Sequence, residues 1–213
     1  MSNGTKHAKR RGERGLCYQL AQAGVRLDGA IIMSDEMRVG LHSQVRRRWC
    51  PVGMKLVQPQ QMRFDHRWLV LGLAVTRLKL RWRWQANLRQ DSMLATVHAW
   101  QQHPDGLDAV VWDNAPAHKT KAVRTAIAGT STGTGGAVIF QPPYAPELNP
   151  VERIFEYLRD HIEGELYATI EAKIERVEQI LHALADDADA LRRLVDWRWI
   201  KDNVQALSLF STP

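Results

Sequence analysis

The chain has 213 residues, of which 45% are hydrophobic and 24% are charged, and it carries a formal net charge of +6 at pH 7. This length fits one catalytic domain with extensions. No apolar run approaches the roughly 18 residues that a membrane span requires, and the N-terminus lacks the apolar region of a signal peptide. The two cysteines lack metal-type spacing, which argues against a disulfide framework or a zinc site. We therefore expect a cytoplasmic protein without a membrane partner.

The predicted elements alternate between short apolar strands and helices. A basic lead-in, partly disordered, covers residues 1–28 and includes a short helix at 16–27. The predicted strands are 29–36, 45–50, 67–75, 77–84, 107–113 and 137–140. The predicted helices are 91–102, 119–128 and one that begins at Pro150, and they are followed by a long acidic helical region at 169–195. A Gly/Thr/Ser segment at 129–136 is predicted to be a flexible insertion. This order indicates an α/β fold with mixed strand directions.

Three acids occupy similar places in this pattern. Asp35 and Asp113 each follow an apolar run, as expected where a buried strand reaches a site. Glu152 follows a Pro-rich turn, where Asn149 is a predicted N-cap and Pro150 suits the first helical position. Each acid also has a structural explanation, because Glu152 completes a near capping box and an Asp-Asn pair after a strand is common in turns.

The chemistry of the three acids favours a hard metal ion. If Asp35, Asp113 and Glu152 converge at one end of a sheet, their repulsion raises their pKa values unless a cation neutralises them. Their oxygen ligands suit magnesium or manganese rather than zinc. Two such ions would stabilise the attacking and leaving oxygens of a phosphoryl displacement. The sequence therefore predicts phosphodiester cleavage or exchange.

The positive charge is concentrated in the middle of the chain. Residues 37–90 contain twelve Arg or Lys against one acid, whereas residues 152–190 contain eleven acids against four basic residues. Such a basic segment beside a carboxylate site is typical of a nucleic-acid enzyme. The strand at 77–84 alternates strictly, so that its basic side chains share one face: Arg77, Lys79, Arg81 and Arg83. This face is interpreted either as a DNA-backbone contact or as charge protection of an exposed edge strand. The cluster Arg46, Arg47 and Arg48 follows soon after Asp35 and is interpreted as a substrate contact.

Three motifs resemble a known enzyme family. They are Ser34-Asp35-Glu36 with the basic residues that follow, Trp112-Asp113-Asn114-Ala115-x-Ala117-His118-Lys119, and Pro142-Pro143-Tyr144-Ala145-Pro146-Glu147-Leu148-Asn149-Pro150-Val151-Glu152. Together they resemble the DDE transposases of the mariner superfamily, and specifically the bacterial insertion-sequence branch known as the "six-thirty" family. The resemblance runs from about residue 29 to 200.

The resemblance implies a ribonuclease H-like mixed sheet flanked by helices, with a helical C-terminal extension. It implies that Asp35, Asp113 and Glu152 form the catalytic and metal-binding triad, with two Mg²⁺ or Mn²⁺ ions, and that Asp35 rather than Glu36 is the ligand. Hydrolysis at the element ends would be followed by attack of a freed 3′-hydroxyl on target DNA. Asn114 and Asn149 are predicted supporting residues, and His118 and Lys119 are candidate DNA contacts. His118 could instead orient Asp113 or cap the following helix.

The resemblance also sets expectations for partners and domains. The DNA partners would be terminal inverted repeats and a target, bound by a homodimer in the bacterial cytoplasm or on the nucleoid. The residues before the first strand are too few for the family's helix-turn-helix region, so a separate polypeptide is expected to supply it, or the chain is truncated. We expect a lead-in at 1–28, a catalytic domain at 29–168 and a helical extension at 169–213.

Two alternatives remain open at this stage. An inactive truncated remnant would bind DNA or assemble with a full-length transposase. A stand-alone ribonuclease H-type nuclease would share the metal chemistry.

Overall fold

A five-stranded mixed sheet forms the centre of the molecule. The computed structural model describes residues 15–16, 18–25, 29–44, 49–55, 57–129, 136–143 and 145–195. The strands are β1 (Ile31–Gly40), β2 (His66–Ala74), β3 (Lys79–Gln85), β4 (Ala109–Trp112) and β5 (Ala137–Phe140), in the spatial order β3-β2-β1-β4-β5. β1, β2 and β3 pair antiparallel, whereas β4 pairs parallel with β1 and β5. The predicted α/β class with mixed strand directions is confirmed.

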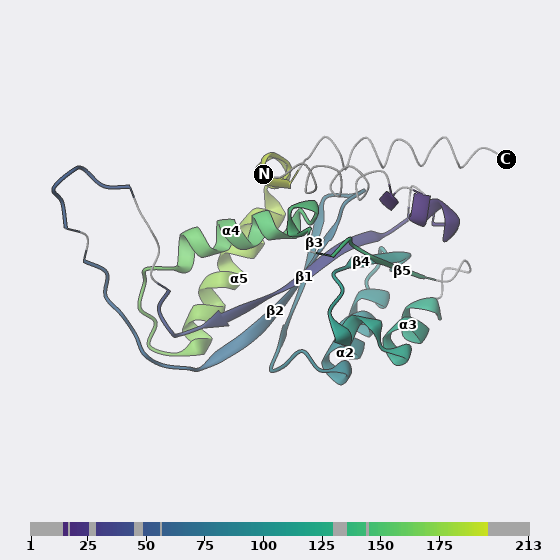
Figure 1. Cartoon of the computed structure of the whole chain (residues 1–213), viewed down its shortest axis with the longest axis horizontal. Helices are drawn as coiled ribbons and strands as arrows, with labels where there is room; N and C mark the ends of the chain where they lie inside the picture. Colours follow the sequence, from purple (N-terminus) through teal and green to yellow (C-terminus); the bar gives the residue numbers. More distant parts are fainter. Residues whose placement is uncertain are drawn as a thin grey trace.

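Helices cover both faces of this sheet (Figure 1). They are α2 (Gln90–Gln101), α3 (Lys121–Ala128), α4 (Val151–Ile162), α5 (Ile170–Asp186) and α6 (Ala188–Val195), with 3₁₀ turns η1 (Pro116–Lys119) and η2 (Pro146–Leu148). The helices α2 and α3 lie on one face, and α4, α5 and α6 on the other. Among the described helices, none is long and apolar enough to cross a membrane.

The two faces follow from the alternation of side chains along β2. Leu69, Leu71 and Leu73 pack against α4, α5 and α6, whereas Val70 and Ala74 pack against α2 and α3. All five side chains are fully buried. A strand that is buried on both faces reads as a continuous apolar run, which is why its position could be predicted closely.

An amphipathic pattern fixes α4 against the sheet. Its buried residues recur at helical spacing: Val151, Ile154, Phe155, Leu158 and Ile162. Each such burial contributes about 1.5–3 kcal/mol. The stripe agrees with the prediction, and it places the first turn of α4, with Glu152, near enough to β1 for the Glu152 charge to act on Asp35.

Several predicted boundaries are wrong. β1 continues to Gly40 because β2 pairs with it along its whole outer half, so Asp35 lies within the strand rather than at its tip. Asp91 is not an N-cap, since α2 begins at Gln90 and Arg89 precedes it without a side-chain cap. The helix predicted at 119–128 is divided into η1 and α3, with Thr120 accepting from the Val123 N–H. The helical region predicted at 169–195 agrees with the structure, where it consists of α5 and α6 with a break at Asp187.

Other predicted elements lie partly outside the described residues. For the strand predicted at 45–50, residues 49 and 50 are not in a strand and 45–48 are not described. Most of the 129–136 insertion and residues 26–28 and 196–213 are also outside the described part. Residues 15–16 and 18–22 are helical, in agreement with the predicted lead-in helix.

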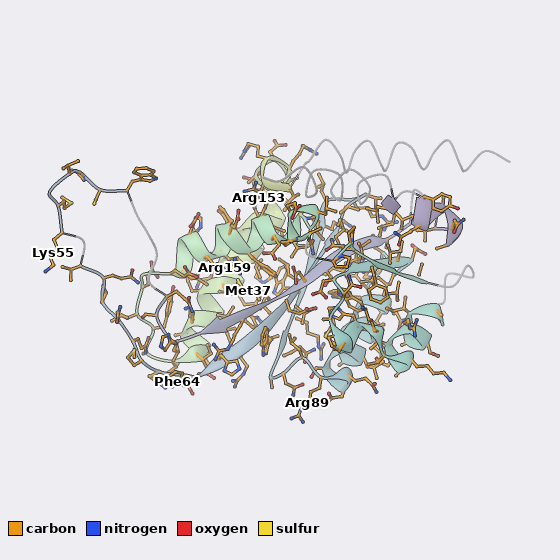
Figure 2. The ribbon with its side chains drawn as sticks, viewed as in Figure 1. Met37, Lys55, Phe64, Arg89, Arg153 and Arg159 are labelled. Atoms are coloured by element: carbon orange, nitrogen blue, oxygen red, sulfur yellow. The ribbon has the colours of Figure 1, made fainter. Side chains whose placement is uncertain are left out.

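A long connection joins β1 to β2 and reaches away from the body of the molecule. Figure 2 shows Lys55 far from the sheet and Phe64 where the chain returns. The connection carries exposed apolar side chains: Trp49, Val52, Met54, Val57, Met62 and Phe64. Such a group of exposed apolar residues is uncommon on an isolated monomer.

Gly72 provides a test of the packing between the sheet and α2. A Cβ at this position would lie 2.7 Å from Ile32 Cγ2 and 3.0 Å from Trp100 Cζ2. We expect Gly72→Ala to lower the free energy of unfolding by about 1–3 kcal/mol, because the added methyl overpacks the core. The matched control is Gly129→Ala, whose Cβ meets only Thr125 O and Ala126 O at ordinary contact distances. Urea denaturation of the three proteins measures the difference, and equal stability of the two variants would contradict this packing.

Candidate active site

Asp35 and Asp113 come to the same level of the sheet from neighbouring strands. The parallel pairing of β1 with β4 joins Ile31 to Ala109 and Met33 to Val111. Two residues further along both chain segments, the same register aligns Asp35 with Asp113, which is the first residue after β4. β1 thus passes beyond the end of β4, and the two carboxylates flank the point where the parallel pairing stops.

The Asp35 carboxyl is held in an environment that disfavours its charge. Burial is the largest cause that raises its pKa, and the negative charges of Glu36, Glu152 and Asp113 raise it further, to about 8. A hydrogen bond from the Glu36 N–H to Oδ1, at 2.8 Å, opposes this shift. Asp113 and Glu152, from distant parts of the chain, therefore both act on the Asp35 carboxyl.

Asp113 has the opposite electrostatic character. Its side chain is 53% exposed. The contact with His118 lowers its pKa, and a hydrogen bond from the Ala115 N–H to Oδ1, at 2.9 Å, lowers it further. Asp113 is therefore ionised at neutral pH while Asp35 tends to hold its proton.

Asn149 attaches the start of α4 to β1. Its Nδ2 donates to Ser34 O at 3.0 Å, and its Oδ1 accepts from the Val151 N–H at 3.1 Å. Asn149 is 1% exposed. The helix begins one residue later than predicted, with Pro150 in the N-cap position, yet Asn149 still caps the first turn. Glu152 thereby lies in the first turn of α4, and no described residue forms a hydrogen bond with its carboxylate.

His118 lies between two acids in the buried part of the site. Its Nε2 is 3.2 Å from Glu36 Oε1, and its Nδ1 is 2.8 Å from Asp113 Oδ1. Burial alone would lower the His118 pKa, but the contacts with Asp113 and Glu36 outweigh it and raise the pKa to about 9. The ring stacks on Trp112 with 4.5 Å between centroids. At 2% exposure, His118 cannot serve as the DNA contact that the sequence suggested.

The sequence did not reveal the part that Glu36 plays. Its side chain is 7% exposed and turns to the face of α2 and α3, opposite Asp35. Strand alternation alone indicates that Asp35 and Glu36 point to opposite faces of β1. Only the fold shows that His118 is the partner of Glu36. The predicted supporting residue Asn114 donates from Nδ2 to Gln141 O at 2.7 Å, which ties the segment after β4 to the segment after β5.

The donors present suit a divalent cation, although they do not form a closed cage. Within the described part of the chain, no three His, Cys, Asp or Glu side chains are grouped closely enough to hold a metal ion. Asp35, Asp113 and Glu152 nevertheless supply only hard oxygen donors, and their mutual repulsion is the kind that a cation relieves. The residues therefore fit Mg²⁺ or Mn²⁺ by donor chemistry.

The basic strand is partly covered on both faces. Arg81 is 4% exposed and donates to Trp100 O and Gly106 O, so it is not available to a DNA phosphate. Asp105, which the sequence did not single out, forms ion pairs with Arg77, Lys79 and Arg81.

On the other face of β3, the Trp82 and Trp84 side chains both donate to the Glu178 carboxylate of α5. β3 is an edge strand, as the second interpretation required, while Arg83 and Lys119 are exposed.

Four predicted motif residues lie outside the described part of the chain. They are Arg46, Arg47, Arg48 and Tyr144. Their proposed contacts stay predictions.

The arrangement is that of known transposase and integrase structures. The chain is similar to the Mos1 transposase in its paired-end complex with the left transposon end, with 13% identity and a TM-score of 0.66 over 97% of this chain and 63% of that chain. The Mos1 mariner paired-end complex with Mn gives 12% identity and a TM-score of 0.66, over 100% and 64% of the two chains. A simian T-cell lymphotropic virus intasome in complex with PP2A regulatory subunit B56 gamma gives 13% identity and a TM-score of 0.50. This match covers 72% of this chain and 49% of that chain.

These similarities define the class of the fold, which is ribonuclease H-like as predicted. The chain spans slightly less than two thirds of the length of the Mos1 chains. No curated protein matches the sequence. Residues 30–174, more than half of the chain, match the family described as DDE superfamily endonuclease. The chain belongs to this family.

Asn149 gives a direct test of how Glu152 is positioned. We expect Asn149→Ala to lower the free energy of unfolding by about 1–3 kcal/mol, because it leaves the buried Ser34 O and Val151 N–H without partners. Asn149→Ser is the matched variant, since a serine oxygen still caps the helix. Its side chain lacks the amide N–H and is too short to reach Ser34 O. Urea unfolding should place the serine variant between wild type and alanine. A serine variant as stable as wild type would show that the link to β1 contributes nothing.

Proposed function

We propose that this chain is the catalytic domain of a DDE transposase of the bacterial insertion-sequence branch. It hydrolyses phosphodiester bonds at the element ends and joins the freed 3′-hydroxyl to target DNA. The observation that carries this proposal is the convergence of Asp113 and Glu152 on the buried Asp35 carboxyl. Membership of the DDE superfamily endonuclease family supports it.

Asp35, Asp113 and Glu152 are the residues that would hold the metal. Two divalent ions, Mg²⁺ or Mn²⁺, would supply Lewis-acid stabilisation of the attacking and leaving oxygens. The Mos1 neighbours include complexes with Mn and with Mg, which supports this choice of metals. Asp35 is half-buried on a central strand, and the Asn149 link holds Glu152 at the start of α4. Such fixed positions lower the cost of organising the reacting groups.

The proposed DNA contacts include one exposed cation whose charge acts on Asp113. Lys119 is exposed in η1, six residues after Asp113, and its Nζ lies 5.6 Å from the centre of the Phe140 ring. Together with Arg46, Arg47 and Arg48 it is proposed to contact the phosphate backbone. Arg83 is exposed on β3 and remains a candidate, whereas Arg81 and His118 are removed because they are buried.

The proposed partners follow from the structural neighbours. A separate helix-turn-helix polypeptide is proposed as the partner that recognises the terminal inverted repeats. The Mos1 neighbours were solved as paired-end complexes, which supports a homodimer on DNA here. The exposed apolar side chains of the β1–β2 connection offer a surface for the second copy.

The proposed activity predicts metal-dependent nicking of supercoiled DNA that carries the element ends. We expect nicking with Mg²⁺ or Mn²⁺ and none with EDTA. The nicking rate of Glu152→Gln should fall by more than about 100-fold, because loss of a direct ligand should cost more than loss of a residue that only supports a ligand. The control is Glu156→Gln, an exposed acid on the same helix, which should match wild type. Agarose gels of the nicked product, with and without a helix-turn-helix polypeptide, give the rates.

Each contrary result has a distinct meaning. Equal inactivity of wild type and Glu152→Gln contradicts the enzyme proposal, and DNA binding without nicking then indicates a remnant. Nicking that does not depend on the element ends indicates a nuclease of ribonuclease H type instead.

A further inference from the structure

One buried group beside the proposed metal ligands is not explained by metal binding itself. His118 lies in η1, three residues before α3 begins. Its ring is stacked on Trp112 at an interplanar angle of 11°. Both ring nitrogens face acids, at 3.2 Å for Glu36 and 2.8 Å for Asp113. A histidine that only filled space in the core would not need a carboxylate at each nitrogen.

We propose that His118 is a positioning residue which fixes the Asp113 carboxylate for the metal and is itself anchored by Glu36. This inference rests on the proposed function and deepens it. Glu36, on the opposite face of β1 from Asp35, serves as the anchor and is not a metal ligand. The acidic pair Asp35-Glu36 thus has two different tasks on the two faces of one strand.

The oxygens of Asp113 support this assignment. Oδ1 accepts a hydrogen bond from the Ala115 N–H, and His118 Nδ1 lies 2.8 Å from the same oxygen. The Nδ1 contact is an ion pair whose angle does not meet hydrogen-bond geometry, and no other described group is a partner of Nδ1. Oδ2 makes no contact of this kind with the described residues. The protein therefore occupies one oxygen of Asp113 and leaves the other to a cation.

Asp35 shows the same division of its two oxygens. Its Oδ1 accepts from the Glu36 N–H at 2.8 Å, and no described hydrogen bond uses Oδ2. Metal-binding carboxylates are commonly oriented by such outer contacts, and the loss of one weakens metal affinity by about 10–100-fold. His118 is the outer contact of Asp113, since the exposed Asp113 side chain lacks the packing that would otherwise fix its orientation.

The chemistry of asparagine and glutamine separates the two contacts of His118. The amide of His118→Asn reaches the position of Nδ1 and keeps a donor for Asp113, but it is too short for Glu36. The amide of His118→Gln reaches the position of Nε2 and keeps the contact with Glu36, but it loses Asp113. Both variants lose the ring stacked on Trp112, so the loss of packing is matched between them.

The experiment measures Mn²⁺ affinity of the full chain from the EPR signal of unbound Mn²⁺, without DNA. We expect His118→Asn to stay within about 3-fold of wild type and His118→Gln to bind at least about 10-fold more weakly, the lower bound for an outer contact. Glu36→Ala should weaken Mn²⁺ binding in the wild-type background by no more than His118→Asn does, because both changes remove the same contact. It should add nothing to His118→Asn, since that variant no longer reaches Glu36. Circular dichroism melting of each variant confirms that it is folded.

The outcomes distinguish the two proposals. Wild-type binding of Mn²⁺ with equal affinities of the asparagine and glutamine variants overturns the positioning role alone. An equal loss from Glu36→Ala in both backgrounds identifies Glu36 as a direct ligand and also overturns it. Absence of Mn²⁺ binding by wild type overturns the proposed function, and the positioning role with it.

Discussion

The side-chain amide of Asn149 is the contact on which the rest of the site depends. A single buried group donates to the backbone of β1 at Ser34 and accepts from the first turn of α4 at Val151. Because Ser34 directly precedes Asp35, this bridge sets how the start of α4 meets the strand that carries the first acid. The apolar stripe of α4 supplies the binding energy for the helix, whereas the amide selects its position along the strand. Glu152 acts on Asp35 as a consequence.

The strand pairing supplies the second constraint. β1 is longer than β4, so the parallel pairing ends at Met33 and Val111 while β1 continues against β2. This leaves Asp35 and Asp113 side by side where the sheet opens, with Asp35 buried and Asp113 exposed. The same alternation sends Glu36 to the other face, where it meets His118. The proposed site therefore draws on both faces of the sheet, with the proposed metal ligands on one face and the His118–Glu36 contact on the other.

The sequence predicted the strands and helices with strong periodicity, and missed what depends on long-range contacts. The core strand β2 and the stripe of α4 were predictable because burial imposes their patterns locally. The extent of β1 was not, since it depends on the partner strand. From the sequence, the alternating basic residues of β3 fitted a DNA contact and an exposed edge strand equally well. Only the fold shows that Asp105 forms ion pairs with three of them and that Arg81 donates to the backbone of α2. The role of Glu36 was likewise invisible, because His118 lies 82 residues away in the chain.

The central claim is that Asp35, Asp113 and Glu152 share divalent cations. Anomalous X-ray scattering from crystals of this chain soaked in Mn²⁺ tests it most directly, because it locates manganese without reference to activity. The account predicts two anomalous peaks among these three carboxylates, with Asp113 Oδ2 rather than Oδ1 towards the metal. Well-ordered carboxylates with no anomalous peak between them, at Mn²⁺ concentrations that saturate the protein in solution, would contradict it.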